Sequence, residues 1–244
     1  MSADTAASPL RPELGDTVED TYARGLVLFM GLELIAAPGA LVPRAETEIL
    51  GETAAKVLTE RTERLGPQTI IDMCTGAGNL ACALAARIPT LRVFASDLTD
   101  GCVAVARRNA ERLGLGDRVR ILQGDLFAAL RGLAPPLEGN VDAIVCNPPY
   151  ISTSRLEKER AELLGAEPRE AFDGGPYGIA IHQRVTREAL DFVKPEGSLF
   201  FEIGAGQGRQ VTLLFQRARA WGEPVGVSDA AGEIRCLHAT RKSV

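Results

Sequence analysis

The sequence has few residues of the kinds that build metal centres and disulfide frameworks. Its 244 residues include two histidines and five cysteines, and no two cysteines are spaced as CxxC. The odd number and wide scatter of the cysteines predict small core residues in a reducing, cytoplasmic setting, with no disulfides and no metal site. We expect the two histidines to be structural or surface residues. The cysteines are Cys74, Cys82, Cys102, Cys146 and Cys236, and the histidines are His182 and His238.

Long apolar runs and an excess of positive charge are also missing. No apolar stretch of about twenty residues is present, which predicts that the chain does not span a membrane. No basic and apolar leader stands at its N-terminus, which predicts no export. Lys and Arg number 27 against 32 Asp and Glu, a net charge of −5, so a nucleic-acid partner is not favoured. Hydrophobic residues make up 45% of the chain, enough for a substantial core.

The pattern of apolar residues divides the chain into three parts. Residues 1–24 are small, polar and acidic and predict a flexible tail, and residues 25–66 predict an N-terminal cap segment with a hairpin or helix-turn and a helix. Residues 67–244 alternate strands with helices, which predicts an α/β domain with a mostly parallel sheet covered on both faces. The expected strands are 69–73, 91–96, 119–123, 141–146, 198–203, 224–228 and 234–239, and the expected helices are 46–65, 79–87, 99–113, 180–193 and 207–221.

A glycine-containing turn follows the first strand of this domain. Residues 72–78 read DMCTGAG, and glycines allow a tight turn and a close approach of the backbone to a ligand. Asp97 ends the next strand, about 20 residues further on, where a carboxylate can bind both hydroxyls of a ribose. This arrangement serves a dinucleotide or an adenosyl ligand, so the turn alone does not choose between them.

The sequence NPPY at residues 147–150 directly follows the fourth strand. Ligands bind at the carboxyl ends of strands in open α/β sheets. Two consecutive prolines remove backbone donors, which leaves the carbonyl oxygens of Asn147 and Pro148 and the side-chain oxygen of Asn147 as acceptors. Such acceptors can hold the two hydrogens of a planar NH₂ group, and Tyr150 offers a flat face against which this group can stack. The loop therefore predicts an enzyme that modifies a planar nitrogen.

The order of a glycine turn, an acidic residue and NPPY resembles class I S-adenosylmethionine-dependent N-methyltransferases. The segment LVPRAETE at 41–48 is similar to the LIPRPETE signature of HemK-like proteins, the release-factor glutamine N5-methyltransferases. The segment AFDGGPYG at 171–178 and the spacing of Asp229, Gly232 and Arg235 match further motifs of that family. Ala45 stands where the family has proline, and Cys74 where it has glycine. The resemblance implies a Rossmann-like fold with a seven-stranded, mostly parallel sheet.

The resemblance also implies roles for individual residues. Asp72, Gly76 and Gly78 would lie at the methionine and ribose end of S-adenosylmethionine, Asp97 at the ribose hydroxyls, and Asp125 and Leu126 at the adenine. Thr75 and Leu98 would also bind the cofactor. Asn147, Pro148 and Tyr150 would hold the acceptor nitrogen as catalytic residues, with Asn147 also close to the cofactor. Pro43, Arg44, Glu46, Pro149 and Tyr150 would bind the substrate.

The sequence alone does not decide which molecule accepts the methyl group, and it leaves other classes of protein possible. The family implies a glutamine side chain of a protein. Family members carry a helical docking domain before the LIPRPETE segment, and only about 40 residues precede that segment here, which favours a small amino, amide or guanidino compound as the alternative. A nucleobase amino group is less favoured, because base flipping needs a basic groove that the acidic composition does not promise. A non-catalytic cofactor-binding partner is less favoured because the NPPY loop is intact. A nicotinamide dehydrogenase would leave that loop unexplained.

The charged segment after the NPPY loop is predicted to be a solvated helix face, because its two signs are interleaved, and a local basic rim is the less favoured alternative. It comprises Arg155, Lys158, Arg160 and Arg169, together with Glu157, Glu159, Glu162 and Glu167.

Overall fold

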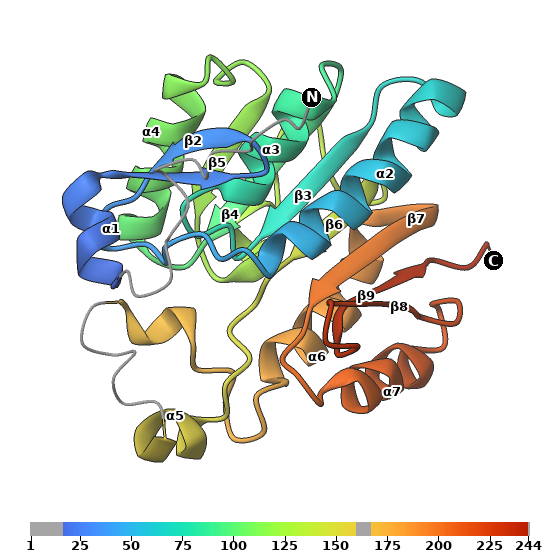
Figure 1. Ribbon diagram of the computed structural model, residues 1–244. Coiled ribbons are helices and arrows are strands. Elements are labelled where there is room, and N and C mark those ends of the chain that lie inside the picture. Colours follow the sequence, from blue (N-terminus) through green and yellow to red (C-terminus); the bar gives the residue numbers. More distant parts are fainter. Residues whose placement is uncertain (1–16, 160–166, 244) are drawn as a thin grey trace, which may run out of the picture.

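The computed structural model describes residues 17–159 and 167–243, which form a seven-stranded sheet and a separate two-stranded hairpin (Figure 1). The order of the large sheet is β5-β4-β3-β6-β7-β9-β8, and only the pairs that include β9 are antiparallel. This confirms the predicted Rossmann-like α/β fold. The strands are β1 (Leu26–Phe29), β2 (Leu32–Ile35), β3 (Thr69–Met73), β4 (Arg92–Asp97), β5 (Val119–Gln123), β6 (Val141–Cys146), β7 (Val193–Glu202), β8 (Val225–Ser228) and β9 (Ile234–Thr240).

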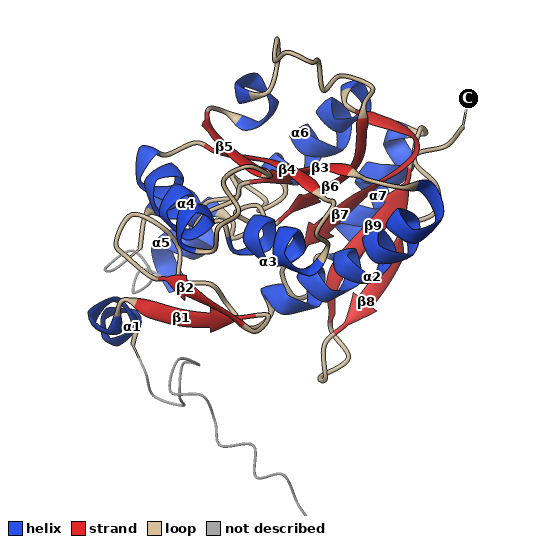
Figure 2. Cartoon of the chain, turned by 90° about the horizontal axis from the view of Figure 1, so that it is seen from above, coloured by secondary structure: helices blue, strands red, loops and turns tan. Residues whose placement is uncertain are grey.

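Helices cover both faces of the large sheet, as the view from above shows (Figure 2). Successive residues of a strand point to opposite faces. Ile70 and Val145 accordingly belong to a core that includes α2, α3 and α4, whereas Ile71 and Ile144 belong to a core that includes α6 and α7. The helices are α1 (Val18–Arg24), α2 (Thr47–Leu65), α3 (Asn79–Arg87), α4 (Asp100–Arg112), α5 (Thr153–Glu159), α6 (Ala180–Glu188) and α7 (Gly208–Ala218), and the short 3₁₀ segments are η1 (Leu126–Ala129), η3 (Arg169–Ala171) and η4 (Ala189–Asp191).

The hairpin predicted as one option for residues 25–41 is present as β1 and β2, and it is attached to α4. The buried side chain of Asn109 accepts a hydrogen bond from the backbone N–H of Ile35 and donates to the carbonyl oxygens of Ile35 and Ala77. One amide thus joins the hairpin, α4 and the glycine turn.

Helix α1 lies inside the range 1–24, for which the sequence predicted a tail. Thr17 and Asp20 form a reciprocal capping box at its start, and Gly25 ends it in the left-handed conformation. These local signals stabilise a helix in a polar segment whose composition suggests disorder. Residues 1–16 lie outside the described residues.

The region 180–203 also differs from the prediction. The helix expected to run to residue 193 ends at Glu188, and after η4 the chain enters β7 at Val193. The register passes from Val141↔Val193 to Ala143↔Ser198, so the residues between the predicted helix and the predicted strand form an irregularity within β7. Glu196 adopts φ +64° there. None of the helices in residues 17–159 and 167–243 is long and apolar enough to cross a membrane.

Candidate active site

The site lies where the connections of the parallel sheet diverge. Strands β3 and β6 are neighbours, and Met73 pairs with Cys146 at their carboxyl ends. Because the chain leaves β3 toward one side of the sheet and β6 toward the other, a crevice opens between the glycine turn and the NPPY loop. The crevice is a cavity of about 390 Å³, a size suited to a small-molecule ligand.

Most residues predicted for the site line this cavity, and five do not. The lining includes Pro43, Arg44, Thr75, Gly76, Asp97, Leu98, Asp125, Leu126, Asn147 and Pro149. The predicted residues that are not part of the lining are Glu46, Asp72, Gly78, Pro148 and Tyr150.

Asp72 supports the glycine turn from beneath. Its side chain is fully buried, and its Oδ2 accepts hydrogen bonds from the Thr75 hydroxyl at 2.6 Å and the Ala81 backbone N–H at 3.0 Å. The carboxyl group therefore joins the end of β3 to the turn and to the first turn of α3. Burial is the main reason that the pKa of Asp72 rises to about 7, although these two hydrogen bonds act in the opposite direction.

This raised pKa predicts that Asp72 destabilises the fold as pH rises. Between the ordinary value of 3.8 and about 7, the folded chain keeps a proton that the unfolded chain has lost, so the free energy of unfolding falls with pH across this window. Asp72→Asn keeps an acceptor oxygen and cannot ionise. Thermal unfolding from pH 4 to 8 should therefore show the melting temperature of the native chain falling by several degrees relative to that of the variant. Parallel pH curves for the two proteins would contradict the assignment.

The two glycines of the turn have different reasons to be glycine. Gly76 lines the cavity at φ +54°, and a Cβ added there would meet no protein atom within 4 Å. Gly78 starts α3 at φ +77°, and a Cβ there would lie 3.0 Å from the Cβ of Ala106 on α4. Gly76 thus leaves space on the cavity side, while Gly78 permits two helices to pack closely. Cys74, at the family's glycine position, has φ +59°, a conformation that glycine adopts with less strain.

Asp97 forms part of the cavity wall at the end of β4. Its Oδ2 accepts a hydrogen bond from the N–H of Gly76 at 2.9 Å, and its Oδ1 accepts one from the N–H of Thr99 at 3.2 Å. The carboxylate is therefore held in a fixed orientation beside the glycine turn. Leu98 next to it lines the cavity and is 55% exposed, so an apolar ligand surface can cover it.

Asp125 has a partner that the sequence did not reveal. Both of its carboxylate oxygens accept hydrogen bonds from Arg184 of α6, at 3.0 and 2.9 Å. Arg184 belongs to no motif and lies 59 residues away, so only the fold brings the two together. Leu126 follows with φ +48° and is almost fully buried at the cavity edge.

The NPPY loop is held by side chains from three other parts of the chain. Asn147 Nδ2 donates to the hydroxyl of Thr47, the first residue of α2, at 3.1 Å. The Tyr150 hydroxyl donates to Glu202 Oε1 at the end of β7, at 3.2 Å, and Gln207 Nε2 donates to the Tyr150 carbonyl oxygen at 2.9 Å. Burial raises the pKa of Tyr150, which keeps its hydroxyl protonated as a donor. Thr47, Glu202 and Gln207 were not singled out from the sequence, although Thr47 lies inside the 41–48 motif.

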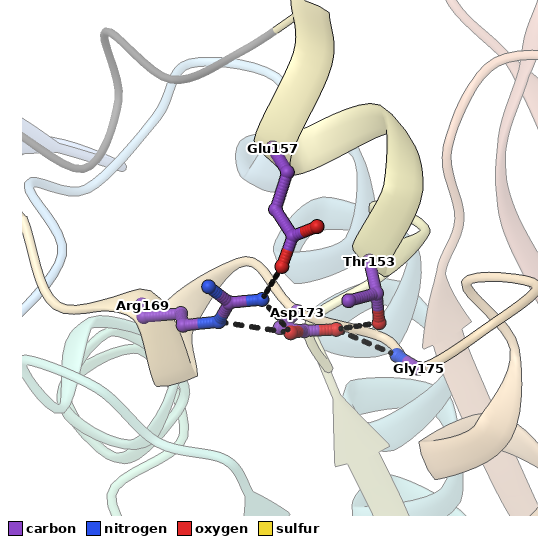
Figure 3. Close-up of polar contacts among 5 residues, drawn as sticks. All are labelled: Thr153, Glu157, Arg169, Asp173 and Gly175. Carbon is purple, nitrogen blue, oxygen red and sulfur yellow. Dashed lines mark hydrogen bonds and ion pairs between the residues drawn. The ribbon is translucent and has the colours of Figure 1, made fainter.

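Residues of the segment 168–173 form one rim of the cavity. Figure 3 shows the polar contacts that hold this segment. Asp173 accepts hydrogen bonds from the Thr153 hydroxyl at 2.7 Å and the Gly175 N–H at 3.0 Å. Arg169 donates to Asp173 and also to Glu157 on α5. Partial burial alone would raise the pKa of Asp173, but the three donors together hold it below its ordinary value. This network ties α5 to the rim.

Glu167 corrects the prediction of a solvated helix face. Arg169 is exposed as predicted, but it lies in η3 and not on α5. Glu167 is buried, and it accepts hydrogen bonds from the Val42 N–H at 2.9 Å and from Arg44. Burial raises the pKa of Glu167, while the adjacent Arg44 guanidinium opposes that change. The pair joins the 41–48 segment to the rim. Arg160 and Glu162 lie outside the described residues.

The cysteines and histidines are buried or half-buried residues that pack in the fold. Four of the five cysteines are buried, and all five are free thiols. His182 is buried with its Nε2 at 2.9 Å from the Glu202 carbonyl oxygen, and burial lowers its pKa to about 4. His238 stacks on Phe200. Within residues 17–159 and 167–243, no group of three or more His, Cys, Asp or Glu residues is placed to hold a metal ion.

Known proteins are similar to this chain in sequence and in architecture. Residues 51–175 match the family model of the methyltransferase small domain. The release factor glutamine methyltransferase of Moorella thermoacetica is 38% identical over 221 residues, which are 91% of this chain and 74% of that protein. The protein of the same name from Streptomyces coelicolor is 35% identical over 90% of this chain and 75% of its own length. The chain belongs to the HemK-like family of methyltransferases.

Solved structures agree on the fold of this HemK-like methyltransferase. Ribosomal protein L11 methylase from Lactobacillus delbrueckii subsp. bulgaricus superposes with a TM-score of 0.57 at 18% identity, covering 85% of this chain and 84% of that one. An RNA methyltransferase from Salinibacter ruber, in complex with S-adenosyl-L-homocysteine, has a TM-score of 0.50 at 15% identity and covers 83% of this chain and 95% of that one. At these identities the likeness shows the fold alone.

The cofactor of this methyltransferase is S-adenosylmethionine, and the residues of the cavity fit it. The open space beside Gly76 leaves room for a ligand against the backbone, and the fixed carboxylate of Asp97 offers acceptors for two hydroxyls. Leu98 and Leu126 supply apolar surface along the same wall. The individual contacts of these residues with the cofactor stay predictions.

Proposed function

We propose that this methyltransferase modifies the side-chain amide nitrogen of a glutamine in a peptide release factor. The observation that carries the proposal is the Asn147 amide at the cavity wall, with its nitrogen bound to Thr47 and its oxygen left to receive an NH₂ group. The names of the relatives from Moorella thermoacetica and Streptomyces coelicolor support the choice of substrate over a small molecule.

The chain's own residues orient the acceptor and exclude water. Bound S-adenosylmethionine would supply an electrophilic methyl group. A glutamine NH₂ donates its two hydrogens to acceptors, and in this proposal Asn147 Oδ1 and the Pro148 carbonyl oxygen receive them. These oxygens also stabilise positive charge that develops on nitrogen, because their dipoles are already oriented before the reaction. Glu202 holds the Tyr150 hydroxyl and Gln207 holds the Tyr150 backbone carbonyl, and in this proposal the Tyr150 ring gives the planar amide a stacking surface.

A mass-shift assay tests the proposal. The purified chain is incubated with S-adenosylmethionine and, in parallel, with an intact release factor, free glutamine and arginine, or an RNA and DNA mixture. We expect the release factor alone to gain the mass of one methyl group, located on a glutamine by peptide fragmentation. A release factor in which that glutamine is replaced by Ala should gain none. Methylation of the free amino acids or nucleic acid with an unchanged release factor would overturn the proposed substrate.

A further inference from the structure

The contact between Asn147 and Thr47 fixes which end of the Asn147 amide faces the cavity. An asparagine side chain has a donor end and an acceptor end, and only the acceptor end can hold an incoming NH₂ group. In the structure the donor end, Nδ2, is bound to the Thr47 hydroxyl at 3.1 Å. The two residues are 100 positions apart, and Thr47 is 2% exposed, so water cannot easily take its place.

The Thr47 hydroxyl has the buried side chain of Glu202 beside it. A hydroxyl has a single proton, so an oxygen that accepts from Asn147 must direct that proton to another group. The buried carboxylate of Glu202 lies beside Thr47 and also receives the Tyr150 hydroxyl. Burial raises the pKa of Glu202. The hydroxyls of Thr47 and Tyr150 act in the opposite direction, because donors beside a carboxyl group stabilise its ionised form. Asn147 Nδ2 can only donate, so the Thr47 oxygen is the acceptor in their contact whatever the charge of Glu202.

We infer that Thr47 is a positioning residue for the methyl-acceptor site: its hydroxyl oxygen holds Nδ2 of Asn147 away from the cavity and so presents Oδ1 to the acceptor. The inference rests on the proposed function in that a glutamine NH₂ is the group to be held. It assigns to α2 a part in the reaction in addition to its part in the core. Without the Thr47 oxygen, the amide can turn over and present two donors to an NH₂ group that needs acceptors.

Two substitutions separate positioning from packing. Thr47→Val keeps the shape of the side chain and loses the hydroxyl, whereas Thr47→Ser keeps the hydroxyl. Thr53→Val is the matched control, since Thr53 is on the same helix and its hydroxyl bonds to the Ile49 carbonyl oxygen at 2.7 Å. All three are compared with the native chain in melting temperature and in calorimetric affinity for S-adenosylmethionine, to show that the fold and the cofactor site are intact.

The first measurement needs no methyl acceptor. The side-chain NH₂ of Asn147 is followed by NMR in the ¹⁵N-labelled chain and identified by its loss in Asn147→Ala. We expect its hydrogen exchange to be slow in the native chain, Thr47→Ser and Thr53→Val. In Thr47→Val we expect exchange that is at least roughly 10-fold faster, because the hydrogen bond is lost. Equal exchange in Thr47→Val and the native chain would overturn the inference.

The second measurement is turnover on the release factor. We expect kcat of Thr47→Val to fall roughly 10- to 100-fold, as for a misplaced orienting group, with little change in KM for S-adenosylmethionine. Thr47→Ser should recover kcat to within about threefold, which a purely structural loss would not show. Full kcat in Thr47→Val, or an equal loss in Thr47→Ser, would overturn the inference. If the native chain leaves the release factor unmodified while the exchange rates differ as expected, the proposed function fails and the positioning role stands.

Discussion

Asn147→Ala is expected to reduce methyl transfer by roughly 10²- to 10³-fold while S-adenosylmethionine binds with nearly native affinity, as for the loss of one preorganised group that stabilises developing charge. Asn147 borders the cavity and is bound by Thr47, so its removal deletes the oriented oxygen and little of the core. Single-turnover rates with the release factor, together with calorimetric titration of the cofactor, measure the two quantities separately.

The control for this prediction is Asn140→Ala. Asn140 is exposed before β6, and its side chain donates to the carbonyl oxygens of Pro136 and Glu138, away from the cavity. It should keep both activity and cofactor affinity. An Asn147→Ala enzyme with the native rate of transfer would show that the side-chain oxygen does not act on the acceptor.

Asp97→Ala should, in contrast to Asn147→Ala, weaken the binding of S-adenosylmethionine. Hydrogen bonds to a charged group contribute about 1.5–3 kcal/mol, so we expect the Kd for S-adenosylmethionine to rise roughly 10- to 100-fold. Part of the loss reflects the turn, because Asp97 also fixes the N–H of Gly76. Calorimetry with S-adenosylmethionine and S-adenosylhomocysteine should show equal weakening, since the two share the ribose.

Asp100→Asn is the matched control for Asp97. Asp100 is an exposed carboxylate three residues away, and its Oδ1 accepts a hydrogen bond from the N–H of Gly101. Its replacement removes the same charge near the same helix end and should leave the Kd unchanged. If Asp100→Asn weakens binding as much as Asp97→Ala does, the effect comes from general electrostatics and not from a contact with the ribose.

Local patterns in the sequence predicted the sheet and the two loops of the site. The strands 69–73, 119–123 and 141–146 have the predicted bounds, because short apolar runs between turn residues identify buried strands directly. The glycine turn and the NPPY loop follow such strands. Their positions at one edge of the sheet therefore followed from the fold class.

The supporting residues could not be predicted in the same way, because their partners lie far away in the sequence. Glu167 bonds to Val42 across 125 positions, and Glu202 bonds to Tyr150 across 52. Each was an ordinary charged residue in the sequence, and interleaved signs made Glu167 look solvated. Burial, which only the tertiary structure supplies, gives these carboxylates their role.

The separation of the partners also affects how the chain folds. The Asn147–Thr47 bond closes a loop of 100 residues, and β3 reaches its neighbour β6 only after β4 and β5 have been passed in the sequence. Closing such long loops costs entropy before contacts repay it, so parallel pairings of this kind form slowly. The acceptor site is therefore complete only when the central strands have paired and α2 has docked. During refolding, methyl-transfer activity should therefore recover no earlier than the native core. The rate of methyl transfer then measures how much of the domain is fully folded.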